Sequence, residues 1–149
     1  LAEAKARWAS EITTGADASA HYENGVRAAI HFLEKFGAKA FDEQAIDTYL
    51  QANSLPAGGL DAQLTAINTQ LWILHFNNIP EGYANWRRTD IPVLLPSPHY
   101  GAVTIDSQTT PLRLCYPLFE SSYNPEGYQS AIQAMGGKDD WNSPVWWDK

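Results

Sequence analysis

Residues 82–92 read Gly82-Tyr83-Ala84-Asn85-Trp86-Arg87-Arg88-Thr89-Asp90-Ile91-Pro92 and join a helical part of the chain to a proline-rich part. Pro80 favours a helix start just before this stretch, and Thr89-Asp90 favours its end. Adjacent helical residues point about 100° apart, so Arg87 and Arg88 need separate partners. The pair is either an anion clamp or a fastener for proline-rich backbone, whose carbonyls need donors. We favour the fastener.

The residues before this stretch have apolar positions three and four apart, which predicts amphipathic helices. The first is expected from Leu1 to Ile12. Gly25 within the second helix costs about 1 kcal/mol relative to alanine, which a close helix–helix approach would offset. The fold class is therefore mainly α. The other expected helices begin after Asp17 or Ser19, after Asp42, after Asp61 and at Pro80.

The amino-acid composition changes after residue 90, because six of the nine prolines lie between Ile91 and Pro125. Such a segment is too proline-rich for a regular helix or a central strand. Residues 103–105 and 112–116 could pair as a short β-hairpin. Asn124-Pro125-Glu126 is typical of a helix start. We find no internal repeat and expect one region over residues 1–149.

Composition and charge exclude several functions. The 149 residues have a net charge of −7 and 44% hydrophobic residues, which argues against nucleic-acid binding and against disorder. No apolar run is long enough to span a bilayer. Cys115, the only cysteine, cannot form an intrachain disulfide. The opening residues are typical of the interior of a helix, so we expect a fragment of a larger chain that leaves Leu1, Ala4 and Trp8 exposed.

No pattern of catalytic or metal-binding residues is present. The four histidines are scattered, and no nucleophile elbow, phosphate-binding loop or dinucleotide-binding motif occurs. A carboxylate pair for glycoside hydrolysis cannot be identified from sequence alone. Asp139-Asp140 lacks the alternating ligands of a calcium loop, so we interpret it as a solvated turn. We predict no catalytic residue, no metal and no cofactor.

Aromatic residues are the remaining candidates for ligand contacts, because tryptophan faces can stack on sugar rings. Trp146 and Trp147 are more simply explained as burying the C-terminal segment against helices. Trp141 stands outside that pair, and His99 and Tyr100 lie in the proline-rich segment. These three are the candidate ligand-binding residues.

Several motifs in order resemble the C-terminal part of SusD/RagB-like outer-membrane proteins. They are residues 71–74, 82–92, 111–117, 123–126 and 144–148, and residues 22–26 resemble an earlier helix of that family. Three positions depart from the family pattern: Leu112 replaces an arginine, Cys115 a proline, and Asp90 a glycine.

The resemblance implies a mostly α-helical, tetratricopeptide-associated fold whose N-terminal helical part lies outside this chain. It implies a cell-surface lipoprotein of the Bacteroidetes outer membrane, anchored through a residue outside this chain. Its partners would be a SusC-like TonB-dependent transporter and an oligo- or polysaccharide. The matched motifs imply structural roles for Trp86, Arg87, Arg88, Arg113, Tyr116, Trp146 and Trp147. Two alternatives stay open: a glycoside hydrolase or related enzyme, and a helical-repeat interaction module without a small ligand.

Overall fold

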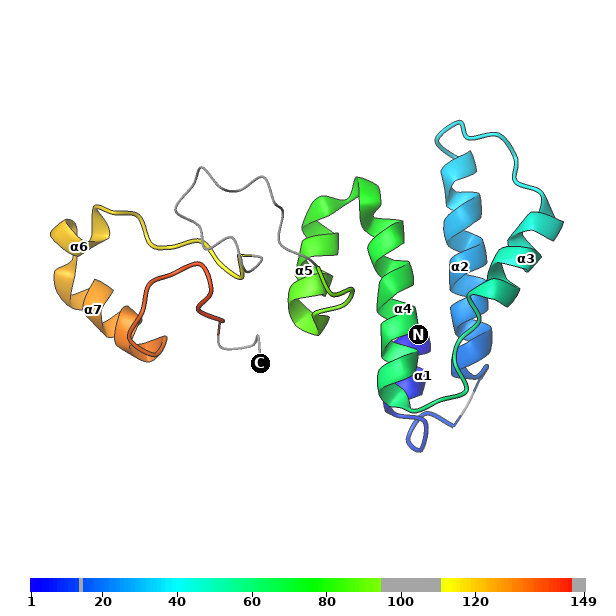
Figure 1. The fold of residues 1–149 in the computed structure, drawn as a ribbon, viewed down its shortest axis with the longest axis horizontal. Helices are drawn as coiled ribbons and strands as arrows, with labels where there is room; N and C mark the ends of the chain where they lie inside the picture. Colours follow the sequence, from blue (N-terminus) through cyan, green and yellow to red (C-terminus); the bar gives the residue numbers. More distant parts are fainter. Residues whose placement is uncertain (14, 95–110, 146–149) are drawn as a thin grey trace. The chain divides into compact units, whose positions relative to one another are not determined.

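A computed structural model describes residues 1–13, 15–94 and 111–145 (Figure 1). The chain folds as two compact units, Leu1–Pro92 and Val93–Lys149. All regular elements in the described ranges are helical, which confirms the mainly α prediction. The first unit contains α1 (Ala2–Arg7), α2 (Ala18–Glu34), α3 (Glu43–Ala52), α4 (Leu60–Leu74), the 3-10 turn η1 (His75–Asn77) and α5 (Ile79–Thr89), and the second contains α6 (Glu120–Tyr123) and α7 (Pro125–Ala134).

Two predicted helix starts are confirmed by their capping bonds. The Asp17 side chain accepts a hydrogen bond from the Ala20 amide at 2.8 Å, at the start of α2. The Asn124 side chain accepts one from the Gly127 amide at 3.3 Å, and Pro125 occupies the first turn of α7. Each cap satisfies a backbone N–H that has no partner within the helix.

Two helix boundaries differ from the sequence prediction. The first helix ends at Arg7 rather than near Ile12, because the chain turns back after Trp8 and the Lys5 ammonium donates to the Ile12 carbonyl at 2.8 Å. The helix expected after Asp61 begins at Leu60 with Gly59 as its N-cap, so Asp61 lies in the first turn. An acid in that turn is still favourable to the helix dipole.

The predicted β-hairpin is wrong for the half that can be described. Residues 112–116 form no strand. Their amides bind another segment instead: Leu112 N–H donates to the Trp141 carbonyl at 2.8 Å, and Tyr116 N–H to the Asp139 carboxylate at 3.2 Å. A side-chain acceptor thus takes the place of a partner strand. The other half, residues 103–105, lies outside the described residues.

The core of the first unit joins three helices. Its buried members come from α2, α3 and α4 and are Tyr22, Val26, Ile46, Leu50 and Ile67. The Tyr22 hydroxyl donates to the Asn53 carbonyl at 2.7 Å, so its polar end is satisfied. α1 contacts both α2 and α4, and α5 packs on α4 (Figure 1). No helix in the described part of the chain is long and apolar enough to cross a membrane.

Candidate functional site

Trp86 anchors the end of the first unit. Its side chain is buried on α5, and its indole N–H donates to the Pro92 carbonyl at 3.1 Å. Tyr83, one turn earlier, stacks on it with ring centroids 6.0 Å apart. The helix ends at Asp90 in the left-handed conformation, with φ 55°. Aspartate tolerates this conformation better than most residues, which explains how it replaces the glycine that the resemblance expects. The tryptophan therefore fastens residues after the helix onto the helix itself.

Arg88 ties α5 to α1. Its two terminal nitrogens donate to the two carboxylate oxygens of Glu3 at 2.8 and 2.9 Å, and one of them also donates to Asn85 at 2.8 Å. Arg7 contacts the same carboxylate at 2.9 Å. The hydrogen bond from Arg88 lowers the pKa of Glu3. This bidentate pair joins residues 85 apart in sequence, so it acts as a fastener.

The Arg88 network continues into the protein through two asparagines. Asn85 donates to the Asn68 side chain at 3.1 Å, and Asn68 in turn donates to the Leu64 carbonyl at 2.9 Å. Asn68 is fully buried. A buried amide is tolerated where its hydrogen-bonding groups find partners. The network therefore links α4, α5 and α1.

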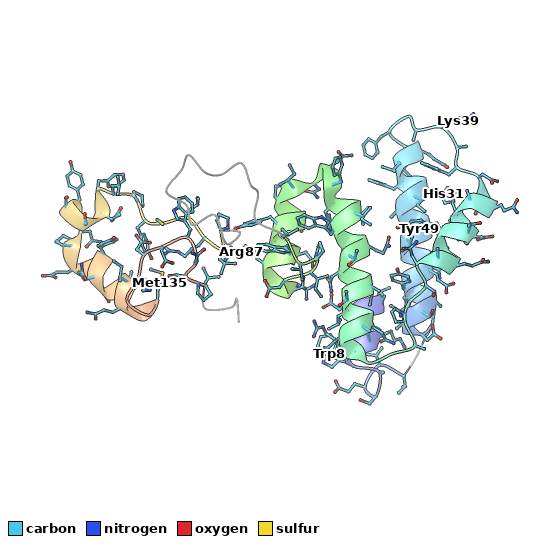
Figure 2. The ribbon with its side chains drawn as sticks, in the orientation of Figure 1. Trp8, His31, Lys39, Tyr49, Arg87 and Met135 are labelled. Carbon is cyan, nitrogen blue, oxygen red and sulfur yellow. The ribbon has the colours of Figure 1, made fainter. Side chains whose placement is uncertain are left out.

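Arg87, the second arginine of the motif, faces a different partner. Arg87 lies on α5 (Figure 2). Its guanidinium lies 5.6 Å from the centre of the Tyr83 ring. That separation is within the range of cation–π attraction. The two adjacent arginines thus have separate partners, as their angular spacing on the helix predicts.

Asp139 is the centre of the second unit. Its carboxylate accepts from the Arg113 guanidinium at 2.8 Å, from the Tyr116 amide at 3.2 Å and from the Tyr128 hydroxyl at 3.3 Å. The side chains of Arg113 and Asp139 are only 8% and 9% exposed. The Arg113 guanidinium also lies 5.2 Å from the Tyr116 ring centre. A single carboxylate therefore connects the segment after residue 111 to α7.

The surroundings of Asp139 disfavour ionisation of two nearby groups, the Cys115 thiol and the Tyr128 hydroxyl. Burial raises the pKa of the Cys115 thiol, and the nearby Asp139 charge raises it further. Burial and the same charge raise the pKa of the Tyr128 hydroxyl. Both groups therefore remain neutral near pH 7, and Cys115 is a poor nucleophile.

The interpretation of Asp139-Asp140 as a solvated turn is wrong. Asp139 is buried in its ion pair, and Asp140 accepts from the Ser143 hydroxyl at 2.7 Å and the Asn142 amide at 3.1 Å. The hydrogen bond from Ser143 lowers the pKa of Asp140. Both acids therefore organise the residues that follow α7.

The candidate ligand residues are only partly visible. Trp141 is half-buried, and its carbonyl accepts the Leu112 amide. His99 and Tyr100 lie outside the described residues, as do Trp146 and Trp147. Of the three candidates, Trp141 alone lies within the described residues.

An apolar groove of about 790 Å³ lies between α2 and α4, and we call it the α2–α4 groove. Its walls include Val26, Ile30 and Leu33 from α2 and Leu71 and Leu74 from α4. Phe76, which also lines the groove, is 82% exposed.

The expected exposure at the start of the chain is confirmed for Leu1 and Trp8, which are 88% and 49% exposed.

Ion pairing engages several of the acidic groups. Glu43 and Asp47 on α3 both contact Arg27 on α2. His31 projects from α2 (Figure 2). It lies between two carboxylates, with its ring nitrogens 3.1 Å from Glu34 and 3.0 Å from Glu43. Within the described ranges no group of three or more histidine, cysteine or acidic side chains is arranged so that it could hold a metal ion. The contacts of Arg27 and His31 with Glu43 and Asp47 join α2 to α3.

Patterns in the sequence do not reveal the roles of four residues in these networks: Glu3, Asn68, Tyr128 and Asp139. Asp139 is a buried ion-pair partner rather than part of a solvated turn. Asn68 follows the core residue Ile67, but a polar residue is not expected in a core. Glu3 and Arg88 are far apart in sequence, so no spacing rule pairs them. The only available signal was the resemblance, which implied a structural role for Arg88 and Arg113 without naming their partners.

Comparisons with known proteins find one family and several solved structures that are similar to this chain. The model of the SusD-like family, described as Susd and RagB outer membrane lipoprotein, matches residues 57–148. A solved chitin-binding protein is 38% identical over 99% of this chain and 32% of its own, with a TM-score of 0.77. A SusD-like protein of Bacteroidetes AC2a is 35% identical over 99% and 28%, with a TM-score of 0.82.

A SusD homologue from Bacteroides fragilis NCTC 9343 is 30% identical, covering all of this chain and 33% of its own, with a TM-score of 0.75. The chain thus spans about a third of the length of these solved relatives. The curated proteins compared contain no match to it.

Proposed function

We propose that this chain, which belongs to the SusD-like family of outer-membrane lipoproteins, is part of a cell-surface protein that binds a glycan without cleaving it. The observation that supports the proposal most strongly is the 38% identity to a chitin-binding protein over 99% of the chain. The family description supports a location at the outer membrane. A SusC-like TonB-dependent transporter is the partner that we infer from the family.

The networks around Arg88 and Arg113 support a non-catalytic role. A catalytic acid or base needs a carboxyl group within reach of a bound substrate and a pKa matched to its task. Glu3 and Asp139 are instead held by arginines, and the pKa of Glu3 is lowered rather than raised. A general acid requires the opposite direction at neutral pH.

We assign no glycan-binding residue to the Trp86 and Arg113 motifs. Trp141, His99 and Tyr100 remain the proposed ligand contacts, on the basis of their aromatic or polar side chains. Replacing Trp141 with phenylalanine keeps the backbone carbonyl that accepts Leu112, so this variant tests the side chain alone. Its expected result is weaker glycan binding with little change in stability.

Cys115 is not the residue that we propose for the lipid anchor. Its thiol is partly buried, and burial raises its pKa, both of which disfavour modification. We propose that the lipid is attached to a residue outside these 149 residues. Metabolic labelling with a fatty-acid analogue, followed by mass spectrometry of the full-length protein, locates the modification.

Isothermal titration of the full-length protein with chitin oligosaccharides and other glycans tests the proposal. We expect saturable binding to at least one glycan and unchanged oligosaccharide length after prolonged incubation. Shortened products that disappear when one carboxylate is changed would instead establish the hydrolase alternative. No binding to any glycan, together with a tight protein partner other than a barrel transporter, would support the interaction-module alternative.

Affinity purification from outer membranes tests the transporter partnership separately. We expect a TonB-dependent barrel to copurify with the full-length protein in stoichiometric amount. A matched sample from cells that lack the barrel gene is the control. Absence of any barrel under conditions that preserve other outer-membrane complexes would contradict the partnership.

A further inference from the structure

The loop between α2 and α3 is bounded by two glutamates that contact the same imidazole. Glu34 is the last residue of α2, and Glu43 is the first residue of α3. The Nδ1 atom of His31 lies 3.1 Å from Glu34 Oε1, and its Nε2 atom lies 3.0 Å from Glu43 Oε1. The same Glu34 oxygen accepts the amide of Phe41, within the loop, at 3.0 Å. One ring therefore connects the two ends of the loop.

These two contacts need a proton on each ring nitrogen of His31. A neutral imidazole has one N–H donor and one lone pair, whereas an imidazolium has two N–H donors. An ionised carboxylate offers only acceptors. With a neutral ring, one nitrogen lone pair would face a carboxylate oxygen with no proton between them. Loss of the proton therefore breaks the contact with either Glu34 or Glu43.

The charged groups next to His31 keep their charge near neutral pH. The amide of Phe41, and after it His31, lowers the pKa of Glu34. Arg27 on α2 contacts the second oxygen of Glu43 at 2.6 Å, and it also contacts Asp47 on α3. Carboxylates and guanidinium groups do not ordinarily change charge between pH 5 and pH 8, whereas imidazole does. Within this cluster, the imidazole is the group that responds to pH.

The other elements packed against α2 add no charge to the ring of His31. Within the part of the chain that the structure describes, the helices that also contact α2 are α1 and α4. Their charged residues form no ion pair with His31, and they are Glu3, Lys5, Arg7 and Asp61. The loop contributes three exposed charged residues, Lys35, Lys39 and Asp42.

We propose that His31 is a proton-dependent clasp between α2 and α3, closed when its ring carries two protons and open when the ring is neutral. The closed form holds one more proton than the open form, so lowering the pH favours closure. Closure holds Phe41 and the first turn of α3 against α2. Phe41 and Ala45 line the α2–α4 groove, so the clasp controls how firmly this part of its wall is held. This inference does not depend on the identity of the glycan.

The size of the effect is limited by the exposure of the clasp. The side chains of His31 and Glu43 are 35% and 62% exposed. An ion pair at such exposure changes an equilibrium by at most about fivefold. The contacts of Arg27 with α3 do not depend on the imidazole, so α3 stays attached to α2 when the clasp opens. We therefore expect a change in local opening of the loop and not in global unfolding.

Hydrogen–deuterium exchange of the full-length protein, followed by mass spectrometry at about pH 6 and about pH 8, tests the clasp. Exchange times are scaled for the intrinsic pH dependence of amide exchange, so that only protection is compared. In peptides that cover residues 35–46, we expect protection about two- to fivefold higher at the lower pH. His31→Gln should remove this difference, and so should Glu43→Gln. His21→Gln changes another histidine of α2, outside the clasp, and should keep the difference.

Three results would overturn the proposal. The first is equal protection of residues 35–46 at the two pH values in the unmodified protein. The second is higher protection at the higher pH, because a clasp that binds a proton on closing has the opposite sign. The third is a pH difference that persists in His31→Gln, which would make His31 a structural contact and place the titrating group elsewhere.

Discussion

Replacing Asp139 with asparagine should destabilise the second unit and raise the population of its open form. The substitution keeps the shape of the side chain but removes the charge that neutralises Arg113. Both side chains are less than 10% exposed, and breaking a pair at such burial costs about 3–5 kcal/mol because one charge is left without compensation. Asparagine can still accept one hydrogen bond, so we expect the lower end, about 3 kcal/mol.

Cys115 reports this change directly, because it is the only cysteine and lies two residues from Arg113. Its side chain is partly buried and burial raises the pKa of its thiol, so its reaction with a disulfide reagent should become faster as the unit opens more often. A loss of about 3 kcal/mol raises the open population about 100-fold, because every 1.4 kcal/mol is a factor of ten. Labelling at several pH values, with each rate divided by the thiolate fraction, corrects for the change in thiol pKa when the Asp139 charge is removed.

Two further variants calibrate the labelling experiment. Tyr128→Phe removes one hydrogen bond to Asp139 and should raise the labelling rate only about two- to tenfold. Glu126→Gln removes an exposed charge from the first turn of α7 and should change the rate less than about fivefold. Labelling of Asp139→Asn at the rate of the unmodified chain would refute the assignment of Asp139 as the centre of this unit.

Three further predictions concern the first unit. Trp86→Phe removes the indole N–H that binds the Pro92 carbonyl and should lower the free energy of unfolding by about 1–2 kcal/mol in urea titrations; an unchanged midpoint would contradict the fastener role. Because Arg88 lowers the pKa of Glu3, the Glu3 carboxylate stabilises the fold above its unfolded pKa of about 4.5, and this contribution is lost as pH falls through the lower folded pKa. Glu3→Gln should therefore flatten the loss of stability between about pH 5 and pH 3, and an unaltered pH profile would refute the pairing. Asn68→Ala should lower the unfolding free energy by about 1–3 kcal/mol, and a stabilised variant would show that its buried hydrogen bonds contribute nothing.

Local signals in the sequence predicted the helices well. The caps at Asp17 and Asn124 depend on side chains within three residues of the amides that they bind, so spacing alone reveals them. The first helix was predicted too long because the periodic position Ile12 continued the apolar pattern past a turn. That turn depends on contacts such as Lys5 to the Ile12 carbonyl, which the apolar pattern does not include.

Long-range polar contacts could not be predicted in the same way. The Arg113 to Asp139 pair spans 26 residues, and the acidic dipeptide that contains Asp139 looks like a surface turn in isolation. The expected strand at residues 112–116 failed for the same reason, because a carboxylate satisfies the Tyr116 amide in place of a neighbouring strand. Gly25 is the converse case: its sequence predicted a helix contact that this chain alone does not supply.

The central claim is that the tryptophan and arginine motifs hold the fold together and take no direct part in ligand capture. Its most direct test is to measure Tm and the glycan Kd of the full-length protein together for Trp86→Phe and Arg88→Lys, with titrations well below every Tm. We predict that Tm falls in both variants while Kd stays within about twofold of its original value. A Kd that rises tenfold while Tm is unchanged would show that these residues contact the ligand, and would contradict the claim.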